Sequence, residues 1–171
     1  MDGFDNIFRE ATANISREYF LLPVVWSPDI YRERVYCYEL YHQLRRRWPD
    51  DCRYRLNGEI DKRGHPYFRE DDWAPKPDLL VHVPGSHDNY AVIEVKTANN
   101  LRNQEVLKDI DTLARFTQDV GYVRGIHLVF GASATETLDL LLHGKADPKA
   151  LGRVEFWGQV ALGVAAERAV W

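Results

Sequence analysis

Residues 77–97 read PDLLVHVPGSHDNYAVIEVKT, and this stretch decides the expected fold. Two largely apolar runs, residues 78–83 and 90–96, flank a short segment that begins with Pro84-Gly85. Runs of this length between turn residues are typical of β-strands. Because parallel strands need a long crossover, so short a connection predicts an antiparallel hairpin.

Charged residues are expected to gather at one end of this hairpin. Alternation along the second strand leaves one face apolar and places on the other face Tyr90, Val92, Glu94 and Lys96. Asp78 opens the first strand, so antiparallel pairing brings it beside the far end of the second strand. We therefore expect the side chains of Asp78, Glu94 and Lys96 to converge.

This grouping suits the hydrolysis of phosphodiester bonds. Two carboxylates supply the hard oxygen ligands that Mg²⁺ prefers, and Mn²⁺ is an alternative cation. A bound cation polarises a phosphoryl oxygen and lowers the pKa of a bound water. Lys96 can orient or deprotonate that water, or neutralise charge in the transition state. The backbone carbonyl of Val95, between Glu94 and Lys96, is a further candidate ligand.

Periodic patterns extend on both sides of the hairpin. Apolar spacing predicts helices over residues 5–20, 29–47, 106–117 and 134–143, and strands over residues 54–60, 125–130 and 154–157. Ser133 and Glu136 have the spacing of a capping box, which predicts the start of the last helix. The order α-α-β-β-β-α-β-α-β indicates an α/β fold with a mixed central sheet flanked by helices.

The composition fits one globular domain over residues 1–171, since 45% of the residues are hydrophobic and 28% are charged. No apolar run approaches the roughly 20 residues of a membrane-spanning helix, and the N-terminus lacks a secretory signal pattern. Cys37 and Cys52 lack metal-type spacing, so we expect a cytoplasmic protein with reduced thiols. The net charge of -4 leaves room for a local basic patch that binds phosphate.

The hairpin residues resemble the PD-(D/E)xK nuclease superfamily. The likeness rests on Pro77-Asp78 and on the tripeptide 94–96 one hairpin later, and it covers about residues 29–130. It implies a restriction-endonuclease-like core of order α-β-β-β-α-β with an extra N-terminal helix. Many members carry a glutamate on the helix before the sheet, and Glu39 fits that position.

The resemblance also implies roles for these residues. Asp78, Glu94 and Glu39 would be metal ligands, and Lys96 would be the catalytic lysine. The substrate would be nucleic acid, most simply DNA, cut to 5′-phosphate and 3′-hydroxyl ends. A non-catalytic module on the same fold, binding nucleic acid or a protein, is the alternative, because one fold hosts many functions. A third alternative is a small-molecule enzyme or a purely structural domain.

Several polar residues outside the trio have two interpretations. Glu39 is either a ligand or a helix glutamate that pairs with Arg46 or Arg47, and Gln43 either holds Glu39 or reaches the phosphate. Arg45, Arg46 and Arg47 contact phosphate or balance a helix C-terminus. The remaining candidates serve the site or are ordinary surface residues: Glu59, Asp61, Lys62, Arg63, His65, Tyr67, Phe68, Arg69, Trp73, Lys76, Gln104 and Lys108.

Two further expectations concern partners. The six histidines lack zinc-type spacing, and no glycine-rich phosphate loop indicates an NTPase. A homodimer would present two sites, and aromatic residues near the C-terminus (Phe156, Trp157 and Trp171) are candidates for its contact.

Overall fold

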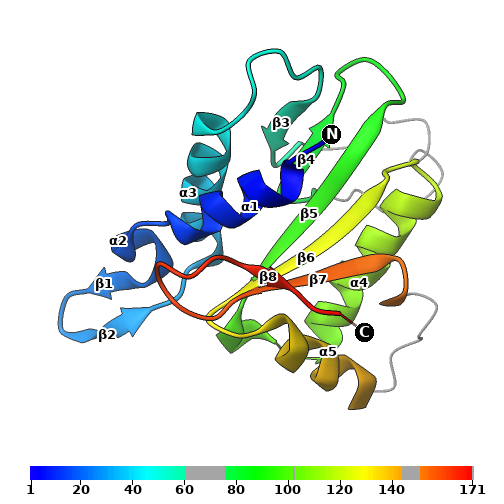
Figure 1. Cartoon of the computed structure of the whole chain (residues 1–171). Coiled ribbons are helices and arrows are strands. Elements are labelled where there is room, and N and C mark those ends of the chain that lie inside the picture. Colours follow the sequence, from blue (N-terminus) through cyan, green and yellow to red (C-terminus); the bar gives the residue numbers. More distant parts are fainter. Residues whose placement is uncertain (61–75, 102, 144–150, 171) are drawn as a thin grey trace.

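A computed structural model of the chain describes residues 1–60, 76–101, 103–143 and 151–170. A mixed sheet of six strands lies at the centre of this part of the chain, with helices on both of its faces (Figure 1). The predicted α/β class with a mixed sheet flanked by helices is therefore confirmed. In spatial order the strands are β3 (Arg55–Gly58), β4 (Leu79–His82), β5 (Asn89–Thr97), β6 (Arg124–Phe130), β7 (Val154–Gln159) and β8 (Glu167–Arg168).

Each face of the sheet has its own hydrophobic core. Side chains on one face of β5, such as Ile93 and Val95, pack with α1 (Phe4–Ala13) and α3 (Glu33–Arg46). Val92, on the other face, packs with α4 (Asn103–Gln118) and α5 (Ala134–His143). Alternation along β5 therefore supplies apolar residues to both layers. The shorter elements are α2 (Arg17–Phe20), β1 (Leu22–Val24), β2 (Ser27–Ile30) and the 3₁₀ helix η2 (Ala98–Asn100).

The strand directions follow from the connections. β4 and β5 form the predicted antiparallel hairpin. The connection from β5 to β6 contains α4, and β5, β6 and β7 run parallel. β8 pairs antiparallel with β7 over only two residues, and the sequence pattern did not predict it. So short a strand carries no measurable alternation.

The N-terminal third departs from prediction at two places. The predicted helix over residues 5–20 is two helices, α1 and α2. At the end of α1 the Thr12 carbonyl accepts from the Ile15 N–H at 3.2 Å and from Gln159 Nε2 at 2.8 Å, so it is satisfied without a longer helix. The second predicted helix starts at Glu33 instead of residue 29, because residues 22–30 form the β1–β2 hairpin.

An extra residue in β5 corrects one predicted face. His82 pairs with Asn89 while Val81 pairs with Ala91, so Tyr90 is unmatched in β4. This irregularity reverses the alternation at the start of the strand. Tyr90 consequently packs against the core on the α1 side. The prediction that Tyr90 shares a face with Glu94 is therefore wrong.

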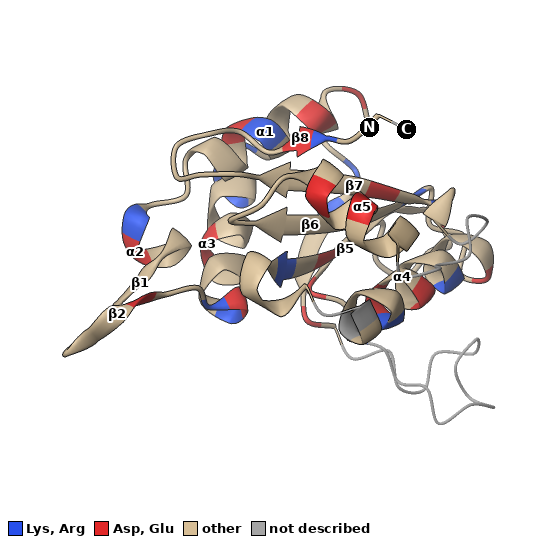
Figure 2. Ribbon diagram, turned by 90° about the horizontal axis from the view of Figure 1, so that it is seen from below, with Lys and Arg blue, Asp and Glu red and all other residues tan. Residues whose placement is uncertain are grey.

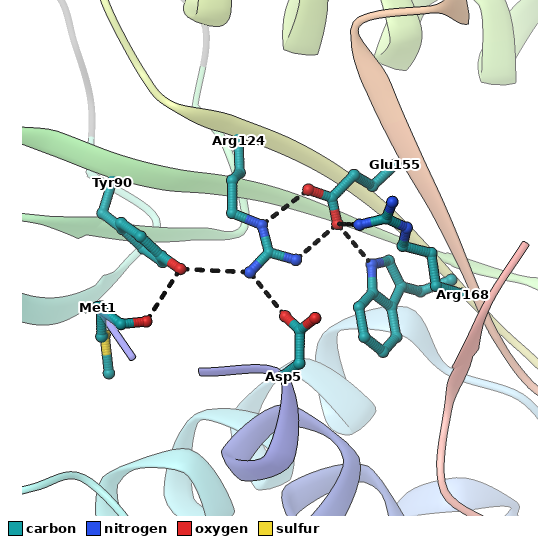
Figure 3. A network of polar contacts seen from close by, with 7 residues as sticks. Met1, Asp5, Tyr90, Arg124, Glu155 and Arg168 are labelled. Atoms are coloured by element: carbon teal, nitrogen blue, oxygen red, sulfur yellow. Dashed lines mark hydrogen bonds and ion pairs between the residues drawn. The ribbon is translucent and has the colours of Figure 1, made fainter. Parts of the chain in front are cut away.

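Arg124 ties the start of the chain to the sheet (Figure 3). Its guanidinium binds Glu155 through two bonds of 2.7 and 2.6 Å, and it pairs with Asp5 of α1 at 2.7 Å. Tyr90 lies beside the same guanidinium and donates its hydroxyl to the Met1 carbonyl at 3.2 Å. The side chain of Arg124 is only 12% exposed. The positive charge of Arg124 is therefore balanced by carboxylates within the fold.

The start of α5 is as predicted. Glu136 N–H donates to Ser133 Oγ at 3.1 Å, and Ser133 N–H donates to Glu136 Oε2 at 2.6 Å. These reciprocal bonds are the capping box. None of the helices in the described ranges combines the length and apolar character that crossing a membrane requires.

Candidate active site

Asp78 and Glu94 meet across the β4–β5 hairpin. Leu79 pairs with Ile93, so the position before β4 lies opposite Glu94. The Val95 N–H donates to Asp78 Oδ2 at 2.8 Å, and the Asp78 and Glu94 carboxyl groups lie close enough to shift each other's pKa. The structure thus brings the two carboxyl groups together at the carboxyl end of β5.

Burial is the main influence on both carboxyl groups. It raises the pKa of Glu94 well above its ordinary value, and the charges of Asp78 and Asp109 add to the rise. Burial also raises the pKa of Asp78, although the Val95 N–H and Lys96 oppose it. Two adjacent, mostly buried carboxyl groups repel each other when both are ionised, so the pair holds a proton to a higher pH than two separate carboxyl groups would. A divalent cation would displace that proton.

Lys96 lies between two further carboxylates. Its ammonium is 3.4 Å from Glu33 Oε1 on α3 and 3.3 Å from Asp109 Oδ2 on α4. Figure 2 shows acidic and basic residues together at this end of β5. Burial alone would lower the pKa of Lys96, but Asp109, Glu33 and Glu94 outweigh burial and raise it. Lys96 therefore stays protonated and is suited to neutralising negative charge.

The donor set fits a hard divalent cation. Mg²⁺ is commonly held by one or two carboxylates, with water and substrate phosphate filling the other positions. Asp78 and Glu94 would supply the carboxylates, and the carbonyl of Val95 remains a candidate ligand. Within the described ranges, no three His, Cys, Asp or Glu side chains are grouped as a complete metal site.

Glu39 is not brought to this group. It lies six positions after Glu33, which turns it by about 120° around the helix axis. Its carboxylate accepts a bond from Gln43 Nε2 at 2.6 Å, and Gln43 is bonded in turn to Arg47. Arg47 also pairs with Glu10 of α1 at 3.6 Å. Glu39 thus belongs to a polar row that leads toward α1, and Glu33 is the α3 carboxylate near Lys96.

Asp109 and His127 were not predicted as site residues. Burial raises the pKa of Asp109 to about 6, although Lys96 opposes the rise. His127 Nε2 lies 3.9 Å from Asp109 Oδ2, and burial, with Lys96, lowers the pKa of His127 to about 3. Neither ring nitrogen of this buried, neutral His127 has a hydrogen-bond partner among the described residues. The feature of the sequence that could have identified Asp109 is its position next to the apolar stripe of α4.

The other predicted candidates have various positions. Glu59 pairs with Lys76 at 2.6 Å and with Arg34 at 3.4 Å, while Gln104 and Lys108 are exposed. Arg45 and Arg46 lie in the last turn of α3, and Arg47 is its C-cap. The remaining loop candidates and one tail residue lie outside the described residues: Asp61, Lys62, Arg63, His65, Tyr67, Phe68, Arg69, Trp73 and Trp171.

The predicted aromatic dimer contact is wrong for two of its three residues. Phe156 and Trp157 are each 1% exposed and belong to the cores on opposite faces of β7. Alternation in a strand that is covered on both faces buries both neighbours. Neither side chain is available to a second copy of the chain.

One of the hollows in the described part of the chain adjoins Asp78. It has a volume of about 410 Å³ and is called here the α3–β3 hollow. It is lined by Tyr38, Tyr41, Asn57, Gly58, Glu59 and Asp78, among others. A hollow of about 690 Å³ borders Arg124 and Glu155, whose charged groups are already paired. A third, of about 540 Å³, borders Ala98, Leu101 and α5. The α3–β3 hollow is therefore the one lined by a member of the carboxyl pair.

Comparisons with known proteins give no relative. No protein-family model matches the chain, and no curated protein or solved structure matches it either. The chemistry of the site therefore rests on its own residues.

Proposed function

We propose that this chain is a Mg²⁺- or Mn²⁺-dependent nuclease that hydrolyses phosphodiester bonds in nucleic acid, with DNA the substrate that the family resemblance implies. The observation that carries the proposal is the pair of Asp78 and Glu94 carboxyl groups, meeting across the hairpin, next to the mostly buried side chain of Lys96. The order α3-β3-β4-β5-α4-β6 also supports a restriction-endonuclease-like core.

The residues of the site would divide the work as follows. Asp78 and Glu94, once deprotonated, would hold the cation, and a cation bound there would supply polarisation of the phosphoryl oxygen and a lower pKa for a bound water. Lys96 remains an ammonium and offsets the negative charge that develops on the phosphoryl group. Because its pKa is raised, Lys96 is a poor acceptor for the proton of the attacking water.

Glu33 and Asp109 would act as positioning residues. They approach Lys96 from helices on opposite faces of the sheet, at 3.4 and 3.3 Å. Two carboxylates on two rigid elements restrict where the ammonium can lie. This arrangement supports a fixed electrostatic role for Lys96.

Cleavage assays test the proposal. Single-stranded and duplex DNA and RNA are incubated with the chain and Mg²⁺ or Mn²⁺. We expect metal-dependent cleavage, and a loss of about 100-fold or more in Asp78→Asn and in Lys96→Met. The matched controls are Asp111→Asn and Lys108→Met, which change exposed residues of α4 and should retain activity.

The outcomes separate the two candidate functions. Full metal-dependent activity in both site variants would refute the assignment of these residues. Nucleic-acid binding without any cleavage by the wild-type chain would favour the non-catalytic module.

A further inference from the structure

The α3–β3 hollow has an aromatic wall and lies directly beside Asp78. Tyr38 and Tyr41, three residues apart on α3, line it, and the side of α3 that carries Arg34 and Tyr38 faces the end of β3. Tyr38 is 60% exposed. An exposed aromatic residue at the mouth of a hollow is available to stack on a planar ligand.

The wall opposite the tyrosines, formed by β3, includes a residue without a side chain. Gly58 of β3 lines it, and a Cβ atom at that position would lie 3.9 Å from Tyr41 Cδ2. The absence of a side chain therefore keeps the space between β3 and Tyr41 open. Asn57, from the same wall, accepts a bond from His82 Nε2 through its Oδ1 at 3.0 Å. Its NH₂ group is the part of this amide that can donate to a ligand.

Cationic side chains lie near the mouth of the hollow, and uncharged polar and aromatic groups form part of its lining. Glu59, the carboxylate farther from β5, is paired with Lys76 and Arg34, whose side chains are 49% and 66% exposed. Two cations thus lie at the surface near the mouth, where phosphates of a bound strand would run. The hollow also offers the ring of Tyr38 at its mouth, the ring of Tyr41 and the amide of Asn57, which suit an uncharged ring with polar edges.

We propose that the α3–β3 hollow binds one unpaired nucleobase, stacked on Tyr38, next to the phosphate that lies at Asp78 and Glu94. This inference rests on the proposed nuclease function and narrows its substrate to single-stranded nucleic acid. The volume of about 410 Å³ is within the range of about 300–1,000 Å³ for small-ligand sites. A base in a duplex would first have to unpair, at a cost of a few kcal/mol.

Binding of short oligonucleotides with phosphorothioate linkages, which resist hydrolysis, tests the inference. Single-stranded DNA, single-stranded RNA and blunt duplex DNA are titrated with the full chain and Mg²⁺, with anisotropy as the readout. We expect single strands to bind more tightly than the duplex, and the two single-stranded arms identify the preferred sugar. Tyr38→Ala should weaken single-strand binding by about 5- to 100-fold, which is the stacking contribution of one base.

Stacking itself can be observed with the fluorescent base 2-aminopurine placed in the single strand. We expect its fluorescence to be quenched on binding to the wild-type chain and to Tyr38→Trp, and to stay high with Tyr38→Ala. Tyr19→Ala is the matched control, because Tyr19 is 37% exposed on α2 and does not line the hollow. Unchanged melting temperatures would show that the variants are folded.

The results distinguish this inference from the nuclease proposal. Equal single-strand binding by wild type and Tyr38→Ala, or tighter binding of the duplex, would overturn the base subsite even if Asp78-dependent cleavage is found. Loss of stacking in Tyr38→Ala without cleavage by the wild type would support the subsite and refute the nuclease.

Discussion

Asp78 and Glu94 bind protons more tightly in the folded chain than in the unfolded chain, because burial raises the pKa of both groups. The contribution of such groups to the free energy of unfolding is fully present below their ordinary pKa of about 4. It is lost as the pH rises through the folded-state pKa. The same holds for Asp109, whose pKa is raised to about 6. Above neutral pH the metal-free site is therefore a source of instability, which is a common cost of a functional site.

Neutralising Glu94 should remove part of this instability. We expect Glu94→Gln to melt at a higher temperature than the wild type at pH 8 without divalent cations, since each pKa unit of the rise corresponds to about 1.4 kcal/mol. The difference should shrink toward pH 4, where the wild-type carboxyl is protonated anyway. Thermal melts across this pH range measure the effect.

The change in melting temperature on adding a divalent cation is a second test of the role of Glu94. Mg²⁺ should raise the melting temperature of the wild type, more at pH 8 than at pH 6, because the cation competes with the shared proton. Glu94→Gln should respond weakly. A variant that is less stable than the wild type at pH 8 would contradict the pKa argument.

The contact between β7 and α5 is an unusually close approach of two elements. A Cβ atom on Gly158 of β7 would lie closer than 3.0 Å to the backbone of Ser133 and Ala134 at the start of α5. Backbone atoms in a helix start that is held by its own capping box cannot move aside easily. The glycine is thus required by tertiary packing.

Gly158→Ala should therefore destabilise the protein by about 3 kcal/mol, the upper part of the range for overpacked sites. Urea unfolding measures the difference in free energy. Gly58→Ala in β3 is the matched control, since its new Cβ would meet only ordinary contacts at 3.6–3.9 Å, and it should stay within about 1 kcal/mol of the wild type. Equal destabilisation by both substitutions would argue against the close contact.

At the scale of the whole molecule, the Arg124 network joins the first residues of the chain to the central strands (Figure 3). Glu155 accepts bonds from Arg124 and from Trp157 Nε1, and its pKa is lowered because these bonds and charges outweigh burial. It is 21% exposed. Removing its charge would leave the guanidinium of Arg124 with Asp5 as its remaining carboxylate partner.

Glu155→Gln should lower the free energy of unfolding by about 2–3 kcal/mol, because breaking one side of a mostly buried ion pair leaves a poorly compensated charge. Chemical unfolding at neutral pH checks this value. Glu167→Gln removes an exposed carboxylate that also pairs with an arginine, Arg9, and should cost less than about 1 kcal/mol. A cost below 1 kcal/mol for Glu155→Gln would show that the network contributes little.

Local pattern alone determined much of this protein. The β4–β5 hairpin, the apolar face of Ile93 and Val95 and the capping box of α5 all depend on residues close in sequence. The short turn likewise allowed the approach of Asp78 to the far end of β5 to be predicted. The exact register depends on the extra residue at Tyr90: continuing the pairing of His82 with Asn89 would place Asp78 opposite Ile93, whereas the observed register places it opposite Glu94.

Only the tertiary structure decided which helix residues reach the site. Glu39 fits the spacing of the helix glutamate, and its i,i+4 bond with Gln43 could be expected from the sequence. The packing of α3, however, brings Glu33 to Lys96. Asp109, on a helix that follows the hairpin, adjoins the same ammonium from the other face of the sheet. Periodicity defines the stripes along a helix, but the rotation and position of the helix are set by contacts with residues far away in the chain.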